Sequence, residues 1–234
     1  MRAISIVGSR MDENIKLCCK LAETFYRRGL NVVVARCSSD DMMEQNHSVG
    51  QYAHCCTCVV NLSSNMPAAA GYDQHKAVDV AQLLKADVLI VENGTDIDWA
   101  PWVIVSNPGQ MVEKQLLSHQ ILAVWGTDIG NGVQQVEDLD QLADLVLEKG
   151  FSLPGLDCGA CGREGCSGLA RDIVVNRAET SDCEAMNASI SATNNGKKIS
   201  MNPFVASLLQ ATISSIFGQL KGVTSGKIVL TMNT

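Results

Sequence analysis

Four cysteines in the second half of the chain have the spacing of metal ligands. They are Cys158, Cys161, Cys166 and Cys183, in the pattern C-x2-C-x4-C-x16-C. Thiolates are soft, anionic ligands that suit iron–sulfur clusters and zinc, and four of them complete either kind of site. Glycines separate the first three cysteines, and glycine lets a loop wrap tightly with its amides available to sulfur.

The uneven spacing of the ligands favours one metal group over the other. Zinc ribbons and fingers more often use two compact pairs of ligands. Here three cysteines come close together and the fourth follows after a gap of sixteen residues. The pattern therefore predicts a [4Fe–4S] cluster, with structural zinc as the alternative and four unligated thiols as a third interpretation.

The cysteine segment also resembles a known domain. The four cysteines, their glycines and the helical run Gly168–Ala178 resemble the small cluster-binding domain of the corrinoid iron–sulfur protein of acetyl-CoA metabolism. That domain occurs in several other anaerobic proteins. The resemblance implies an oxygen-sensitive [4Fe–4S] cluster and an anaerobic cell.

Composition limits the class of protein. The 234 residues are 46% hydrophobic and 18% charged, which is typical of a globular chain long enough for two domains. A net charge of −7 argues against a nucleic-acid or anionic-membrane surface. We expect a cytoplasmic protein without membrane insertion, because we find neither a long apolar run nor a signal peptide. Ten cysteines then indicate metal or redox chemistry and not a disulfide framework.

A second group of cysteines lies in the first half of the chain. Cys55, Cys56 and Cys58 occur within four residues, and Cys37 could join them if the fold brings it near. These four thiols could hold a second metal or [4Fe–4S] cluster. The alternative is packing at a strand edge, because an unligated cysteine behaves as a small hydrophobic residue.

Short apolar runs alternate with helical patterns through residues 1–152. This alternation predicts an α/β domain with a doubly wound, mostly parallel sheet. Pro154-Gly155 marks a boundary, after which residues 153–234 are predicted to form a small α+β domain with the cluster. Strands are expected at 3–7, 31–35, 87–92, 102–105 and 121–124, and helices at 14–28, within 68–84 and before Gly150.

The first strand-to-helix turn has part of a phosphate-binding loop. Gly8 stands where the first glycine of G-x-x-x-x-G-K-[ST] belongs, but Glu13 follows where the second glycine should be. Lys16 comes two positions late, and Glu92 ends a strand where α/β folds place functional acids. Gly8, Lys16 and Glu92 therefore form at most a vestigial nucleotide site. The missing lysine and hydroxyl argue against an enzyme that hydrolyses nucleotides.

The layout of the first domain resembles the molybdopterin-guanine dinucleotide biosynthesis adaptor (MobB) family of P-loop proteins. The residues that carry this resemblance are Gly8, Arg36, His47-Ser48, Glu92-Asn93-Gly94 and Pro101. The resemblance implies the P-loop-type fold. The family binds GTP through a lysine that this chain lacks.

The C-terminal tail is predicted to contain a hairpin, a helix and a final strand. The turn is Asn194-Asn195-Gly196, and Asn202 should cap a helix over Phe204–Leu220 with one buried apolar stripe. Lys227–Met232 is the expected last strand. This tail resembles the extension of MobB-like proteins of anaerobic archaea that carry a cluster motif before it.

Three functions follow from these patterns. The first is an iron–sulfur accessory or regulatory protein that docks on a larger anaerobic metalloenzyme, such as a corrinoid methyltransferase complex, for electron transfer or redox sensing. The second is a GTP-binding adaptor in molybdopterin-guanine dinucleotide assembly, and the third is a zinc-stapled structural module. Near the cysteines, Arg163, Glu164 and Arg171 could tune the cluster or face a partner, but as charged side chains of a loop and a helix we expect them to be solvated.

Overall fold

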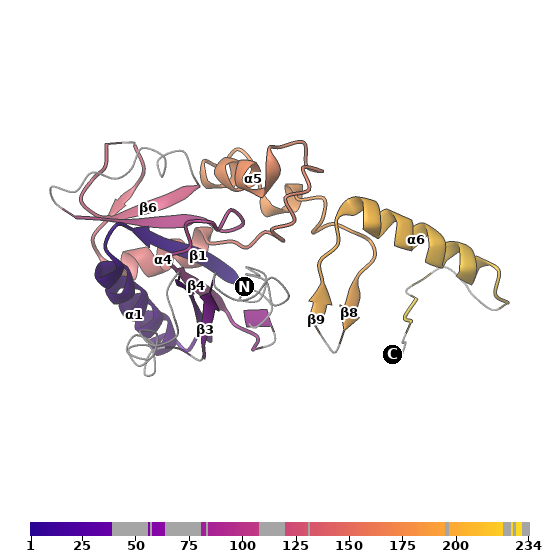
Figure 1. Cartoon of the computed structure of the whole chain (residues 1–234), viewed down its shortest axis with the longest axis horizontal. Helices are drawn as coiled ribbons and strands as arrows, with labels where there is room; N and C mark the ends of the chain where they lie inside the picture. The colour runs from indigo at the N-terminus through magenta and orange to yellow at the C-terminus, as the bar shows by residue number, and fades with distance from the viewer. Residues whose placement is uncertain are drawn as a thin grey trace.

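A parallel β-sheet forms the body of the molecule (Figure 1). The computed structural model describes residues 1–38, 56, 58–63, 81–82, 84–107, 120–130, 132–194, 197–221, 226 and 228–230. The sheet has seven strands in the order β3-β2-β4-β1-β5-β6-β7, and every pairing is parallel. This confirms the predicted α/β fold. The strands are β1 Arg2–Gly8, β2 Val32–Ser38, β3 Cys58–Ser63, β4 Val88–Glu92, β5 Trp102–Ser106, β6 Ile121–Gly126 and β7 Gln135–Val136.

The central strands are apolar on both faces because both faces are covered. All five residues of β4 and all five of β5 are buried. When a parallel sheet is covered on both sides, the sequence of each strand is a continuous apolar run and does not alternate between apolar and polar residues. The sequence runs of valine and isoleucine therefore gave strand positions accurate to one to three residues.

Two helices cover one face of the sheet. They are α1, Met11–Arg27, and α4, Leu139–Lys149, and they meet in one core with residues such as Leu21, Phe25 and Leu142. Asp138 caps α4 by accepting a hydrogen bond from the Gln141 backbone N–H at 2.8 Å. The expected start of α1 at Asn14 was three residues late. The first turn already forms on the Arg10 carbonyl, which accepts from the Glu13 and Asn14 N–H groups.

The cysteine region covers the other face. Its helix α5, Gly165–Val174, buries Leu169 and Ala170 in a core that also contains Leu89 and Val91 of β4. The loop after β4, residues 93–101, adds buried Trp99, whose carbonyl accepts a hydrogen bond from the Leu153 N–H at 2.8 Å. The predicted domain boundary at 152/153 therefore falls inside one continuous apolar core. The cysteine region packs directly on the sheet that precedes it in the chain.

The C-terminal tail extends away from the sheet (Figure 1). It contains a hairpin of β8, Ala192–Asn194, and β9, Lys197–Ile199, followed by α6, Pro203–Gly218. The predicted cap is confirmed, because the Asn202 side chain accepts from the Val205 N–H at 2.9 Å. The predicted buried stripe is wrong, because only Ala206 of this helix is buried, and Leu208 and Ile216 of the stripe are 55% and 58% exposed. Residues 228–230, the described part of the predicted last strand, are not in a strand.

A buried ion pair joins the carboxyl ends of two neighbouring strands. Arg36 of β2 and Glu92 of β4 are register partners, and Arg36 Nε lies 3.4 Å from Glu92 Oε1. The side chains are only 8% and 0% exposed. Removing one member of such a pair leaves the other charge buried without its partner, which is more costly than replacing both.

None of the described helices is both long and apolar enough to cross a membrane.

We predict that Arg36→Met lowers the free energy of unfolding by about 3–5 kcal/mol, because it leaves the Glu92 carboxylate buried without its partner. The double variant R36M/E92M should recover most of that loss. Urea unfolding measures both, with the buried Trp99 and Trp102 as fluorescence reporters. A single variant that is no less stable than the double variant would contradict a charge pair at this position.

Candidate iron–sulfur site

The four predicted ligands come from three segments of the cysteine region. Cys158 and Cys161 lie in the loop before α5, Cys166 lies in its first turn, and Cys183 follows the short 3-10 helix η2, Thr180–Asp182. Cys158 is exposed and Cys161 half-buried, whereas Cys166 and Cys183 are buried. Cys183 lies within electrostatic range of the other three, since Cys158 and Cys161 raise its pKa and it raises that of Cys166. The fold therefore gathers the four thiols into one region.

No three His, Cys, Asp or Glu side chains converge on a point suited to a single metal ion within the part of the chain that the structure describes. Thiolates are ligands of both zinc and iron–sulfur clusters, so the surroundings of each sulfur bear on either group.

Three of the sulfurs have N–H donors close by. The Asp157 backbone N–H donates to Cys166 Sγ at 3.4 Å. The backbone N–H groups of Met186 and Ala185 lie close enough to Cys183 to oppose the rise of its pKa, with the Met186 N–H donating to the Cys183 carbonyl at 3.0 Å, and Cys161 helps to raise the pKa of the nearby Arg163 guanidinium. Hydrogen bonds of this kind favour the anionic sulfur and tune the potential of an iron–sulfur cluster. The donor set therefore fits such a cluster.

Burial and hydrogen bonding act in opposite directions on the two inner thiols. Burial raises the pKa of Cys166 to about 11, and the hydrogen bond from Asp157 opposes that rise. Burial also raises the pKa of Cys183, against the N–H groups of Met186 and Ala185. Both thiols are therefore protonated at neutral pH before they bind a metal. Because cysteine binds metal as thiolate, loading the site must release protons.

A close contact between Asp157 and the start of α5 sets the loop conformation. Asp157 Oδ1 accepts a hydrogen bond from the Cys166 backbone N–H at 2.8 Å, so this side chain caps the helix from outside. A Cβ atom on Gly165 would lie 1.9 Å from the same oxygen, and Gly165 has φ +66°. Gly162 has a similar φ of +76°, but a Cβ atom there would meet nothing within 4 Å. The glycine at 165 is thus required by contact as well as by conformation.

An arginine connects the segments that carry the cysteines. Arg163 Nε donates to Asp172 Oδ2 of α5 at 2.9 Å, and Arg163 Nη2 lies 3.3 Å from Asp182 Oδ2 of η2. The expectation that Arg163 is simply solvated is therefore wrong. Glu164 does match that expectation, since its side chain is 95% exposed and its nearest approach to Arg171 is 3.9 Å. The sequence did not predict these two ion pairs of Arg163, because its acidic partners lie nine and nineteen residues away.

The predicted nucleotide residues have other partners. Lys16 Nζ lies 3.1 Å from Glu13 Oε1 and its side chain is 61% exposed. Glu92 is paired with Arg36 in the core. At Gly8, a Cβ atom would lie 2.5 Å from Asn14 Oδ1. Gly8 and Glu92 lie at the same edge of the sheet, but the charges of Lys16 and Glu92 are already balanced by side chains of this chain.

The register of the sheet separates two of the cysteines proposed for a second metal site. Cys58 pairs with Val33, whereas Cys37 pairs with Leu62, four positions further along the strands. At about 3.3 Å per residue this offset is about 13 Å along the strands. Cys56 packs against the core beneath α1, and Cys55 lies outside the described residues.

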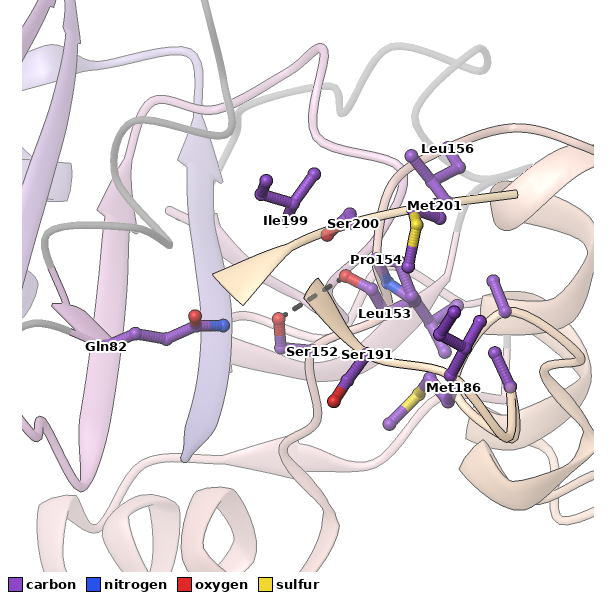
Figure 2. Close-up of a pocket in the computed structure, with 13 residues that line it drawn as sticks. Gln82, Ser152, Leu153, Pro154, Leu156, Met186, Ser191, Ile199, Ser200 and Met201 are labelled. Carbon is purple, nitrogen blue, oxygen red and sulfur yellow. Dashed lines mark hydrogen bonds between the residues drawn. The ribbon is translucent and has the colours of Figure 1, made fainter. Parts of the chain in front are cut away.

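A small cavity lies where the tail meets the linker to the cysteine region (Figure 2). Its volume is about 150 Å³. Ala185 and Met186, which follow Cys183, form part of its wall together with Leu153 and Met201. The lining residues include no charged side chain. The cavity beside the Cys183 turn thus has a mixed lining, which includes Gln82 and three serines, and offers no titratable group for acid–base chemistry.

Comparison with known proteins bears on the same segment. Residues 153–184 match the protein family described as "Putative Fe-S cluster". All four predicted ligands lie within the match. The segment is similar to an iron–sulfur domain, which supports an iron–sulfur cofactor.

The chain as a whole has few matches. No curated protein matches it. One similar solved structure is titled "Crystal Structure of molybdopterin-guanine biosynthesis protein B (mobB)", with 17% identity, a TM-score of 0.42, and coverage of 62% of this chain and 97% of that one. The fold assignment above rests on the strand order and not on this likeness.

We predict that Gly165→Ala disrupts the site far more than Gly162→Ala. Both substitutions force alanine into a left-handed conformation, at about 1–2 kcal/mol each, but only the first drives a methyl group into Asp157. Iron and acid-labile sulfide per chain, measured after anaerobic reconstitution, should therefore fall by more than half in G165A and stay near the wild-type value in G162A. Equal losses in the two variants would show that the Asp157 contact does not matter.

Proposed function

We propose that this chain is a [4Fe–4S] protein that serves as an accessory or regulatory subunit of a larger metalloenzyme. Cys158, Cys161, Cys166 and Cys183 are the proposed ligands. The observation that carries this proposal is the gathering of these thiols in one region, with N–H donors close to three of the sulfurs. The family match over residues 153–184 supports the cofactor class.

A subunit role follows from the completeness of the ligand set. When bound by four cysteines, a cluster supplies one-electron chemistry and has no open iron for a substrate. Buried Cys166 and Cys183 anchor the site to the sheet, while exposed Cys158 leaves one side accessible from outside. That exposed side is where a redox partner would approach.

The partner is the least constrained part of the proposal. The resemblance of the cysteine segment to the cluster domain of the corrinoid iron–sulfur protein favours a corrinoid methyltransferase complex in an anaerobic, archaeal cell. Electron transfer or redox sensing would then serve the metal centre of that larger enzyme. The interface would involve the Cys158 side of the cysteine region.

We predict about four iron and four sulfide per chain after anaerobic purification, with a brown colour that bleaches in air. Cys183→Ala should lose most of both, because it removes one ligand. Cys19→Ser, a cysteine substitution in α1, should retain them. Zinc without sulfide in the wild-type protein would contradict the redox function, and about eight iron would require a second site among the N-terminal cysteines.

The alternative, a GTP-binding adaptor in molybdopterin-guanine dinucleotide assembly, requires a working nucleotide site. The ion pairs of Lys16 with Glu13 and of Glu92 with Arg36 weigh against it. We predict no saturable binding in a calorimetric titration with GTP and Mg²⁺ up to about 1 mM, an affinity weaker than about −4 kcal/mol. Micromolar affinity for GTP would favour the adaptor over the accessory subunit.

A further inference from the structure

Arg163 contacts each of the three segments that supply the cysteines. It belongs to the loop with Cys158 and Cys161, and its guanidinium donates to Asp172 on α5 at 2.9 Å. Its Nη2 atom lies 3.3 Å from Asp182, the residue immediately before Cys183. Since Cys166 lies in the first turn of α5, this one side chain connects all the parts of the proposed ligand set.

The geometry of the contacts suits arginine and not lysine. A guanidinium presents several N–H donors in a rigid plane and can serve two carboxylates at once, whereas an ammonium is a single point of charge. The Arg163 side chain is only 25% exposed, and the two carboxylates are 28% and 44% exposed. These ion pairs are therefore partly shielded from water and stronger than fully exposed ones.

The charge of Arg163 also lies at the ligand set itself. Arg163 follows Cys161 by two residues, and the nearby Cys161 side chain is one of the groups that raise the pKa of the guanidinium. Positive charge and N–H donors at a ligand sulfur stabilise the more negative, reduced form of a cluster and so raise its potential. Arg177 also pairs with Asp172, but through the other carboxylate oxygen. Its Nη2 atom lies 2.8 Å from Asp172 Oδ1, and its side chain is 70% exposed.

We propose that Arg163 is a positioning residue with two effects: it closes the cysteine loop onto α5 and η2, and its positive charge beside Cys161 raises the reduction potential of the cluster. This inference rests on the iron–sulfur function proposed above. It adds a residue outside the ligand set that sets a property of the bound group.

Opposite charge changes at one ion pair separate this proposal from a purely structural role. Arg163→Gln removes the positive charge beside Cys161, whereas Asp172→Asn removes a negative charge that partly neutralises it. A purely structural role predicts that both variants loosen the same loop and shift the potential in the same direction. The proposal predicts opposite directions, downward for R163Q and upward for D172N.

The experiment is a mediated redox titration of the reconstituted full-length protein, followed by its visible spectrum, with iron and sulfide counted in each sample. R163Q should lower the equilibrium constant for reduction about tenfold, which is about 59 mV for a one-electron couple. D172N should raise it about threefold, a modest electrostatic effect for a partly exposed pair. Arg163→Lys should keep most of the wild-type potential, because it keeps the positive charge. It should bind less iron, because an ammonium cannot serve both carboxylates as the planar guanidinium does.

Arg177→Gln is the matched control. Like R163Q, it removes a positive charge paired with Asp172, but it leaves Arg163 beside Cys161. The reduction potential and iron content of R177Q should therefore match those of the wild type. A shift in R177Q as large as that in R163Q would overturn the proposal. So would shifts of the same sign in R163Q and D172N.

The outcomes also distinguish a failure of the role of Arg163 from a failure of the proposed iron–sulfur function. A wild-type protein that binds no iron and sulfide refutes both. A loaded wild-type protein with an unchanged potential in R163Q refutes only the role of Arg163. If R163Q binds too little iron to titrate, D172N and R163K decide, because a D172N potential at or below the wild-type value overturns the inference.

Discussion

The packing of Cys166 and Cys183 against the second face of the sheet is the contact on which the proposed site depends. Both thiols share a core with Leu89 and Val91 of the central strand β4. Helix α5 adds Leu169 and Ala170 to that core. Because a buried apolar contact resists displacement, half of the ligand set is fixed by the stability of the whole sheet. The cysteine region therefore covers a sheet face that would otherwise be open to water.

This arrangement creates a conflict that the surrounding polar groups resolve. Burial favours the neutral thiol and raises the pKa of Cys166 and Cys183, whereas a metal ligand must be a thiolate. N–H donors from Asp157 and from the turn after Cys183 act in the opposite direction. The region thus combines an apolar anchor with directed donors, which is how proteins hold anionic sulfur away from water.

The carboxyl edge of β1, β2 and β4 carries charged side chains, in contrast to the buried thiols of the cysteine region. α/β folds commonly bind phosphates at such an edge, where the first helix begins. Here Glu92 meets Arg36 in the core, and Lys16 meets Glu13 at the surface. Charges that could contact a ligand are instead balanced within the chain.

The amino-acid sequence was enough to predict the α/β fold, the helix cap at Asn202, and the cysteine spacing that the family match supports. These features depend on local patterns of apolar, capping and ligand residues. How distant segments meet depends instead on the three-dimensional packing of the chain. It placed α5 on the sheet, paired Arg163 with Asp182 nineteen residues away, and left α6 largely exposed despite its apolar stripe. Periodicity shows that a helix has an apolar face, but burial of that face requires a partner surface that local sequence does not specify.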